Sequence, residues 1–418
     1  MAFRFRYFFK LIIICIFLIG CADSEKIAGT RVDVIDQLAV VQSLVPIELP
    51  EMIKTNVWEG ALESRPETLN YFFNGEPEKT WSLNLNIGRI LGPPVIYDHK
   101  IIVFGERGLL KCWDLKTREL LWSYSISSDN GSKQTLIGGG LSYDLAGNLY
   151  GTSSNGDIFS VKIDSGALNW TFQIEAPIMG APTVVENTIF VTDVTNVSRS
   201  ISSTGNLNWL VRGIPYNQIR ATTGQPVPAG DVLLLPSSSG ILSAVDKEIG
   251  SKQWDFKFKY NRSGFAQSTF GSFNGYPIVH EDKIYFGSVA GQFNALTLDG
   301  AVLWETNVGL QGIPLLLSNS IFFVSDTNKL IRLNKRTGSL IWATELGSKN
   351  DLQNYFSPVL IGSKIWITSS DGRLSSFGVL TGNKLDQIKV PSSIAGAPIY
   401  YSGNIILYTN SSELVAFE

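Results

Sequence analysis

The chain has 418 residues, of which 44% are apolar and 17% are charged, and its formal net charge is −3. This composition is typical of a globular protein and excludes a disordered chain. The acidic balance argues against nucleic-acid binding, which needs a basic surface. With two histidines and three cysteines in the whole chain, we expect no histidine-rich metal site, no zinc cluster and no disulfide framework.

The first 20 residues have the features of an export signal. Three positive residues precede the apolar stretch 11–20, which is too short to cross a bilayer core, since a spanning helix needs about 20 residues. The stretch ends in Leu18-Ile19-Gly20-Cys21 and resembles the lipobox of bacterial lipoproteins. That resemblance implies cleavage before Cys21, lipidation of this cysteine and, because Ala22 follows it, delivery to the outer membrane. An ordinary signal peptide is the alternative.

One phrase recurs along the rest of the chain: an apolar strand, a polar turn that usually ends in glycine, then three residues and a tryptophan. Its copies lie at 112–122, 165–170, 204–209, 244–254, 295–304 and 337–342, and a seventh at 381–386 keeps the turn but ends in Asp386. From Trp122 to Trp342 the phrase repeats about every 44 residues, the length of one four-stranded propeller blade.

The chemistry of the phrase agrees with a propeller blade. An aspartate caps its own turn, and a glycine takes the positive φ that ends a hairpin turn. The tryptophan then lies on the last strand, where a large ring can fill the gap between wedge-shaped blades. Earlier strand pairs, such as 100–105 and 283–287, bring each repeat to four strands.

The two ends of the repeat region complement one another. The stretch 414–418 is a third-strand phrase without its turn and tryptophan, and the missing fourth strand lies at 79–85, around Trp81. We therefore expect the N-terminal strand to complete the last blade and close the ring, which removes both free sheet edges. The sequence predicts an all-β, eight-bladed β-propeller of four-stranded blades. Seven blades or an open array are the alternatives.

These patterns divide the chain into three segments. We expect a lipoprotein signal peptide at 1–20, a lipidated tether with a pre-propeller segment at 21–75, and the propeller at 76–418. Cys112 lies in an apolar strand pattern, where a small buried side chain is the expected role.

The Gly-x-x-x-Trp phrase also resembles the blades of quinoprotein alcohol and glucose dehydrogenases. That resemblance implies pyrroloquinoline quinone (PQQ) and Ca²⁺ at the centre of the ring, an aspartate base and a vicinal disulfide. The chain has no Cys-Cys pair, and its repeated aspartates, among them Asp114 and Asp246, occupy turns, where capping explains them. We expect no catalytic residue, no cofactor and no metal. A PQQ-dependent periplasmic dehydrogenase and a glycan-binding lipoprotein are alternative functions.

The lipobox at 18–21, the segment 49–81 and the blade phrases as far as Glu418 together resemble the BamB family, lipoproteins of the outer-membrane β-barrel assembly machinery. The blade phrase alone is not specific, but the combination covers nearly the whole mature chain. The resemblance implies a non-enzymatic scaffold, lipid-anchored in the outer membrane and facing the periplasm. It implies binding to the periplasmic domains of BamA and to other subunits, and help in delivering unfolded outer-membrane proteins.

The resemblance also implies partner-binding residues. In the family, an arginine within an apolar-Arg-Gly-x-Ser-Ala-Pro-like phrase contacts BamA, and the best match here begins with Ile219 and Arg220. This match lacks the glycine after the arginine, so Arg212-Gly213 is a competing placement, and an ordinary solvated arginine is a third reading. The family's acidic residues in the next loop match Ser272 and Asn274. Neither is acidic, so that contact has changed or the match is misplaced.

Overall fold

The structure is a computed structural model that describes residues 46–53, 69–73, 75–126, 135–214, 224–258, 273, 275–288, 291–347 and 353–418. All of them belong to one compact unit, residues 38–418, and the other unit, 1–37, lies outside the described residues. Every regular element in the described part of the chain is a β-strand. The predicted lipidation site, Cys21, also lies outside it.

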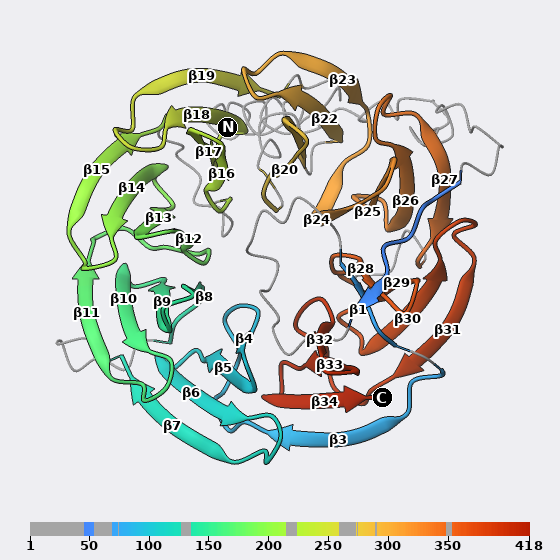
Figure 1. Ribbon diagram of the computed structural model, residues 1–418, viewed down its shortest axis with the longest axis horizontal. Coiled ribbons are helices and arrows are strands. Elements are labelled where there is room, and N and C mark those ends of the chain that lie inside the picture. Colours follow the sequence, from blue (N-terminus) through green and yellow to red (C-terminus); the bar gives the residue numbers. More distant parts are fainter. Residues whose placement is uncertain are drawn as a thin grey trace, which may run out of the picture. The chain divides into compact units, whose positions relative to one another are not determined.

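Within this unit the sheets follow one another around a ring, and the strands of each four-stranded sheet succeed one another from the inside of the ring to the outside (Figure 1). The first three described four-stranded sheets are β4 (Val95–Tyr97), β5 (Lys100–Phe104), β6 (Leu109–Asp114) and β7 (Leu120–Ser125); β8 (Gly139–Tyr143), β9 (Asn148–Ser153), β10 (Asp157–Lys162) and β11 (Leu168–Gln173); and β12 (Thr183–Val185), β13 (Thr188–Thr192), β14 (Val197–Ser202) and β15 (Leu207–Arg212). The next three are β16 (Val227–Ala229), β17 (Val232–Pro236), β18 (Ile241–Asp246) and β19 (Lys252–Lys257); β20 (Ile278–His280), β21 (Lys283–Ser288), β22 (Gln292–Thr297) and β23 (Val302–Thr306); and β24 (Leu310–Leu317), β25 (Ser320–Ser325), β26 (Lys329–Asn334) and β27 (Leu340–Glu345). The last combines β32 (Ile399–Tyr401), β33 (Asn404–Tyr408) and β34 (Glu413–Phe417) with β3 (Lys79–Asn84).

One sheet has six strands and corrects the prediction from sequence. It contains β28 (Val359–Ile361), β29 (Lys364–Thr368), β30 (Arg373–Gly378) and β31 (Lys384–Lys389), extended by β2 (Asn70–Tyr71) and β1 (Met52–Ile53). The prediction of eight four-stranded blades is therefore wrong: the described residues form seven four-stranded blades and this larger sheet. The two added strands are only two residues long, too short for a strand pattern to show in the sequence.

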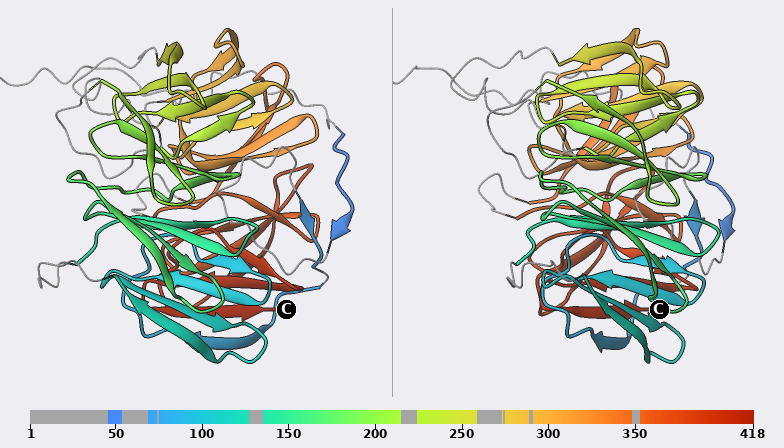
Figure 2. Two further views of the ribbon diagram at one scale, coloured as in Figure 1. Left: turned by 60° about the vertical axis from the view of Figure 1, so that its left-hand side comes forward. Right: turned by 90° about the vertical axis from the view of Figure 1, so that its left-hand side faces the viewer.

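The added strands are held by a buried asparagine and two aromatic rings. Asn70, 1% exposed, donates from Nδ2 to Ser363 Oγ at 3.1 Å and accepts from Ser363 N at 3.0 Å. The ring of Tyr71 stacks on Tyr400 with centroids 4.6 Å apart. The strands therefore join the core of the ring, and Figure 2 shows β1, in blue, on one side of it.

The first and last strands of the ring pair with each other. β3 pairs antiparallel with β34, and Trp81 lies opposite Ala416. The sheet that contains them thus takes its outer strand from the start of the ring sequence and its three inner strands from the end, as the complementary ends of the repeat region predict.

Outer strands are fastened to the next sheet by their tryptophans. In five of the described outer strands the indole Nε1 donates to a backbone carbonyl in the following sheet, and the pairs are Trp122 with Ile163, Trp170 with Ser203, Trp209 with Lys247, Trp254 with Leu298 and Trp304 with Lys335. A turn glycine of that sheet lies over each ring, so close that a Cβ on it would stand under 3.0 Å from ring atoms. This contact between successive copies explains why both glycine and tryptophan recur in the phrase.

Connections between antiparallel strands alternate between two faces of the ring. Tight hairpins, such as 186–187 and 203–206, lie on one face, which we call the turn face. The loops between second and third strands, such as 193–196, and the longer links between sheets, such as 174–182, lie on the other, which we call the loop face. Longer connections are the usual place for binding residues, so the loop face is where a site is expected.

Candidate functional site

The structure does not test the predicted partner-binding residues. Ile219, Arg220, Ser272 and Asn274 all lie outside the described residues, so they stay a prediction. The competing placement, Arg212-Gly213, is described and lies at the end of β15. The site is therefore built from the residues that lead into and support the connection after β15.

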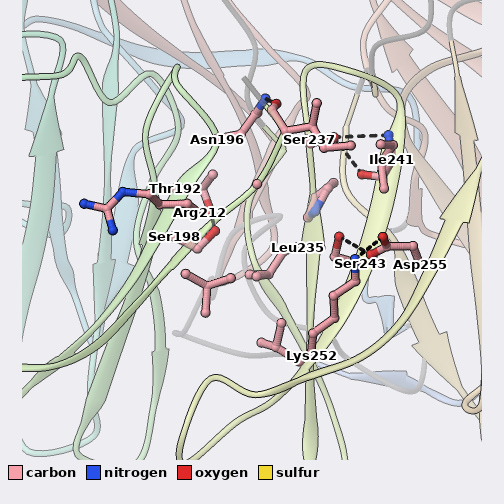
Figure 3. Close-up of a pocket in the computed structure, with 15 residues that line it drawn as sticks. Thr192, Asn196, Ser198, Arg212, Leu235, Ser237, Ile241, Ser243, Lys252 and Asp255 are labelled. Carbon is pink, nitrogen blue, oxygen red and sulfur yellow. Dashed lines mark hydrogen bonds and ion pairs between the residues drawn. The ribbon is translucent and has the colours of Figure 1, made fainter. Parts of the chain in front are cut away.

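A cavity of about 250 Å³ lies beside Gly213 and Ile214, between the β12–β15 and β16–β19 sheets (Figure 3). It is lined by residues of the first sheet, Thr192, Asn196, Ser198, Val211, Arg212, Gly213 and Ile214, and of the second, Leu235, Pro236, Ser237, Ile241, Ser243, Val245, Lys252 and Asp255. The labelled side chain of Arg212 extends away from the cavity (Figure 3).

The polar side chains around the cavity are largely paired with one another. The hydroxyls of Thr192 and Ser198 are 2.8 Å apart, and Ser243 Oγ donates to Asp255 Oδ1 at 2.7 Å. Lys252 forms an ion pair with the same carboxylate. Because these groups satisfy each other, the cavity offers mainly an apolar lining to whatever enters it.

Asn196 connects the two sheets at the loop-face end of the cavity. Its side-chain Nδ2 donates to Ile214 O at 2.9 Å, and its Oδ1 accepts from Ser238 N and Ser238 Oγ, both at 3.0 Å. Its own carbonyl accepts from Gly213 N at 2.8 Å. One buried asparagine therefore fixes the start of the connection after β15 to both sheets.

The neighbouring loop is stiffened by a buried carboxylate. Asp193 Oδ1 accepts from Thr195 N at 2.8 Å and from Val197 N at 3.2 Å. Its Oδ2 pairs with Arg199 Nη1 at 2.7 Å, and its side chain is fully buried. A carboxylate that is buried, paired and hydrogen-bonded holds a loop in one shape.

Sequence reasoning missed Asn196. The equivalent loop position is glycine in other repeats, as in Gly156 and Gly372, and Asn196 shares their positive φ, at 62°. Asparagine tolerates this conformation, and Asn328 has it as well, at 60°, so the residue type indicates the turn and only the structure shows the contacts of the Asn196 side chain.

A second cavity, of about 700 Å³, lies at the loop-face end of the ring's centre. It is lined by residues 90–93, 311–313, 354–357, 395–397, 399 and 408. None of these described lining residues is acidic or basic. A quinone cofactor with a calcium ion needs carboxylate ligands and an aspartate base, so this donor set does not fit that group. Among the described residues there is also no group of three histidine, cysteine or acidic side chains suited to a metal ion.

Two of the repeated aspartates, Asp114 and Asp246, cap the turns in which they lie. Asp114 Oδ1 accepts from the backbone N–H groups of Lys116 and Thr117, at 2.7 and 3.0 Å, and Asp246 Oδ1 accepts from Glu248 and Ile249, both at 2.9 Å. The prediction of turn capping is confirmed at these two positions.

Cys112 is buried in β6, as the sequence predicts. Burial raises the pKa of its thiol to about 12, so the thiol stays protonated and unreactive near neutral pH. Among the described residues, no helix has the length and apolar character needed to cross a membrane.

Comparisons with known proteins agree on one family. A family model described as outer membrane protein assembly factor BamB matches residues 129–299 and 294–418. BamB of Moranella endobia is 22% identical over 84% of this chain and 92% of its own length. The crystal structure of BamB from Moraxella catarrhalis covers 82% of this chain and all of its own, with a TM-score of 0.71 and 14% identity.

The fold is also shared with an enzyme. Quinohemoprotein alcohol dehydrogenase from Comamonas testosteroni covers 87% of this chain and 81% of its own, with a TM-score of 0.68 and 12% identity. At this identity the likeness concerns the propeller alone, since one fold carries many functions.

Proposed function

Since the chain belongs to the family of outer membrane protein assembly factor BamB, we propose that it is a non-enzymatic scaffold of outer-membrane protein assembly that binds the periplasmic domains of BamA through its loop face. The observation that carries the proposal is the family match over residues 129–418. It is supported by the loop-face end of the β12–β15 and β16–β19 sheets, where Asn196 and Asp193 hold the described loops in place.

The proposed contact residues follow from the same family. Ile219 and Arg220 would lie in the connection that Asn196 helps to start, and Ser272 and Asn274 in the next long link between sheets. A scaffold needs loops presented in a fixed arrangement, because ordering them on binding costs free energy. The inter-sheet bonds of Asn196 reduce that cost at one end of this connection.

We further propose that Cys21 carries the lipid anchor and that the protein faces the periplasm from the outer membrane. The support is the Leu18-Ile19-Gly20-Cys21 sequence and the family match. Replacing Cys21 by serine should release the protein from the membrane fraction into the soluble fraction, as fractionation and immunoblotting would show. Retention of the variant in the membrane would contradict lipidation at this cysteine.

The scaffold role is tested by affinity purification of the tagged full-length protein from gently solubilised envelopes. Recovery of BamA with the wild type, and its loss with Arg220→Glu, supports both the role and the site. Arg212→Glu is the matched control for the competing placement: loss with this variant alone moves the contact to the end of β15. If BamA is absent while other complexes survive solubilisation, the scaffold role is wrong.

The enzyme alternative has its own test. Adding PQQ and Ca²⁺ to the purified protein should give no change in quinone absorbance and no dye reduction with alcohols, because the central cavity lacks charged lining residues among those described. Saturable binding with turnover would favour the dehydrogenase.

A further inference from the structure

The residue four positions after the tryptophan has the same place in each sheet. It follows the outer strand and packs at the loop-face end of the boundary with the next sheet. These residues are Leu85, Ile126, Ile174, Phe258, Val308 and Leu346, with Val390 four positions after Asp386. In the β12–β15 sheet this position is Gly213.

The backbone at Gly213 is arranged as in its counterparts. Gly213 N donates to the carbonyl of Asn196 at 2.8 Å, as Ile174 N does to Gly156 at 3.0 Å and Leu346 N does to Asn328 at 3.0 Å. The difference is therefore confined to the missing side chain, and the boundary between the two sheets lacks the residue that fills the others.

A second position beside the cavity carries no aromatic ring. Two residues after the tryptophan, three other outer strands have Tyr124, Phe172 and Phe256. β15 has Val211 there, while β23 and β27 have Thr306 and Thr344. Val211 and Gly213 both line the 250 Å³ cavity. At the boundary that Leu346 helps to line, the corresponding cavity is about 60 Å³.

The mouth of the cavity carries an exposed apolar residue. Ile214 follows Gly213 and is 59% exposed, although its carbonyl is held by Asn196. β15 is also the outermost strand of its sheet, so its outer edge has no strand partner within the described residues. Such an edge accepts an extended segment of another protein.

We propose that the cavity lined by Val211, Gly213 and Leu235 is a socket for one large aliphatic or aromatic side chain of a partner protein, presented by an extended segment that lies beside β15. The equivalent positions identify the occupant, because a single Ile, Leu, Val or Phe fills each of them from within the chain. This inference rests on the proposed scaffold function and specifies how the partner is held. A buried apolar anchor in a pocket is the usual centre of a protein interface.

The test fills the cavity with a larger side chain of the protein itself. Val211→Phe installs the residue type of the equivalent position in β11, and Gly213→Leu installs that of β27. Gly213 does not have a positive φ, so leucine suits its backbone. A Cβ there would nevertheless stand 2.9 Å from Asn196 O. Val211→Phe does not create this close contact. Ile174→Leu is the matched control, since it exchanges residues of similar volume where the boundary is already filled.

Binding and stability are measured together on the full-length protein. The binding partner is the purified periplasmic region of BamA, with affinity measured by isothermal titration calorimetry and stability by urea unfolding. We expect both filled variants to bind at least about tenfold more weakly, the loss of one buried apolar anchor. We expect Val211→Phe to keep or raise the urea midpoint, because added packing fills a void. Ile174→Leu should change neither quantity.

Each other result has a definite meaning. If the wild type and both filled variants bind alike, the socket inference is wrong and the scaffold function stands. If the wild type itself does not bind, the scaffold function and the inference that rests on it both fail. If binding and stability fall together in Val211→Phe, the cavity is already filled by the protein's own chain, which also overturns the inference.

Discussion

Gly205 lies over the indole ring of Trp170 so closely that a Cβ on the glycine would stand 2.8 Å from ring atom Cδ2. Trp170 also donates from Nε1 to Ser203 O at 2.7 Å, so one turn both covers the ring and accepts its hydrogen bond. The sheets of the ring are thus joined by pairs in which glycine is needed twice, for its positive φ of 86° and for its lack of a side chain.

The glycine requirement can be divided into its two parts by mutation. Gly205→Ala should lower the free energy of unfolding by about 2–4 kcal/mol, because backbone strain adds to the clash with Trp170. Gly147→Ala is the matched control: its φ is 80° and nothing lies within 4 Å of its Cβ position, so only the strain of about 1 kcal/mol remains. Urea unfolding of both variants measures the difference, and equal losses would mean that the ring contact contributes nothing.

Asn196 should stabilise the boundary through its side chain and not through its backbone. Asn196→Gly keeps the positive φ but removes the bonds to Ile214 and Ser238, so we expect a loss of about 1–3 kcal/mol. Asn328→Gly is the control, because Asn328 has a φ of 60° and makes no side-chain bridge between sheets in the described part of the chain. A similar loss in both variants would assign the effect to the backbone. Chemical denaturation followed by tryptophan fluorescence gives both values.

Asp386 should make stability depend on acid. The Lys364 ammonium, 2.9 Å away, together with the Ser376 hydroxyl, holds the pKa of this carboxyl below its ordinary value. A carboxyl with a lowered folded-state pKa stabilises the fold above its unfolded pKa of about 4 and loses that contribution as the pH falls through the folded value.

Asp386→Asn should therefore be less stable than the wild type by about 1 kcal/mol at pH 7, since the pair is partly exposed, and the difference should shrink below about pH 4. Urea midpoints at a series of pH values check this expectation. Lys364→Gln should flatten the same dependence. A difference between wild type and Asp386→Asn that stays constant from pH 7 to pH 3 would contradict the ion pair as its source.

Arg118 occupies the turn position that is glycine in the other tryptophan-bearing repeats, and its φ is 64°. A left-handed conformation costs a residue with a side chain about 1–2 kcal/mol, partly offset by the greater entropy of glycine in the unfolded chain. Arg118→Gly should therefore raise the free energy of unfolding by about 0.5–1 kcal/mol, measured by urea unfolding. A decrease would mean that the arginine side chain stabilises the turn by more than its backbone strain costs.

The sequence was most informative where a contact repeats. Glycine and tryptophan recur because each pair joins two sheets, so the periodicity predicted the propeller. The complementary ends of the repeat region predicted the pairing of β3 with β34. Even the exception at Asp386 has a structural reason. The next sheet takes its outer strand from β3 and its third from β34, so no turn connects them to receive a tryptophan ring.

The features that the sequence did not predict depend on contacts that occur once. β1 and β2 join a sheet through Asn70 and Tyr71, whose partners Ser363 and Tyr400 are about 300 residues away in the chain. The cavity beside β15 exists where Gly213 lacks the apolar side chain of its counterparts, and this difference becomes visible only when the equivalent positions are compared in space. The predicted contact residues, Ile219 and Arg220, stay predictions, because they lie outside the described residues.

The pairing of β3 with β34 also sets an order of events during protein synthesis. β3 leaves the ribosome before any other strand of the four-stranded sheets, and its partner is the last to appear. A ribosome that stalls before residue 413 therefore holds a chain whose first outer strand has nothing to pair with. Contacts of such long sequence separation form slowly, so closure is a late step of folding, and a missense or truncating change in either strand would act on the completion of folding.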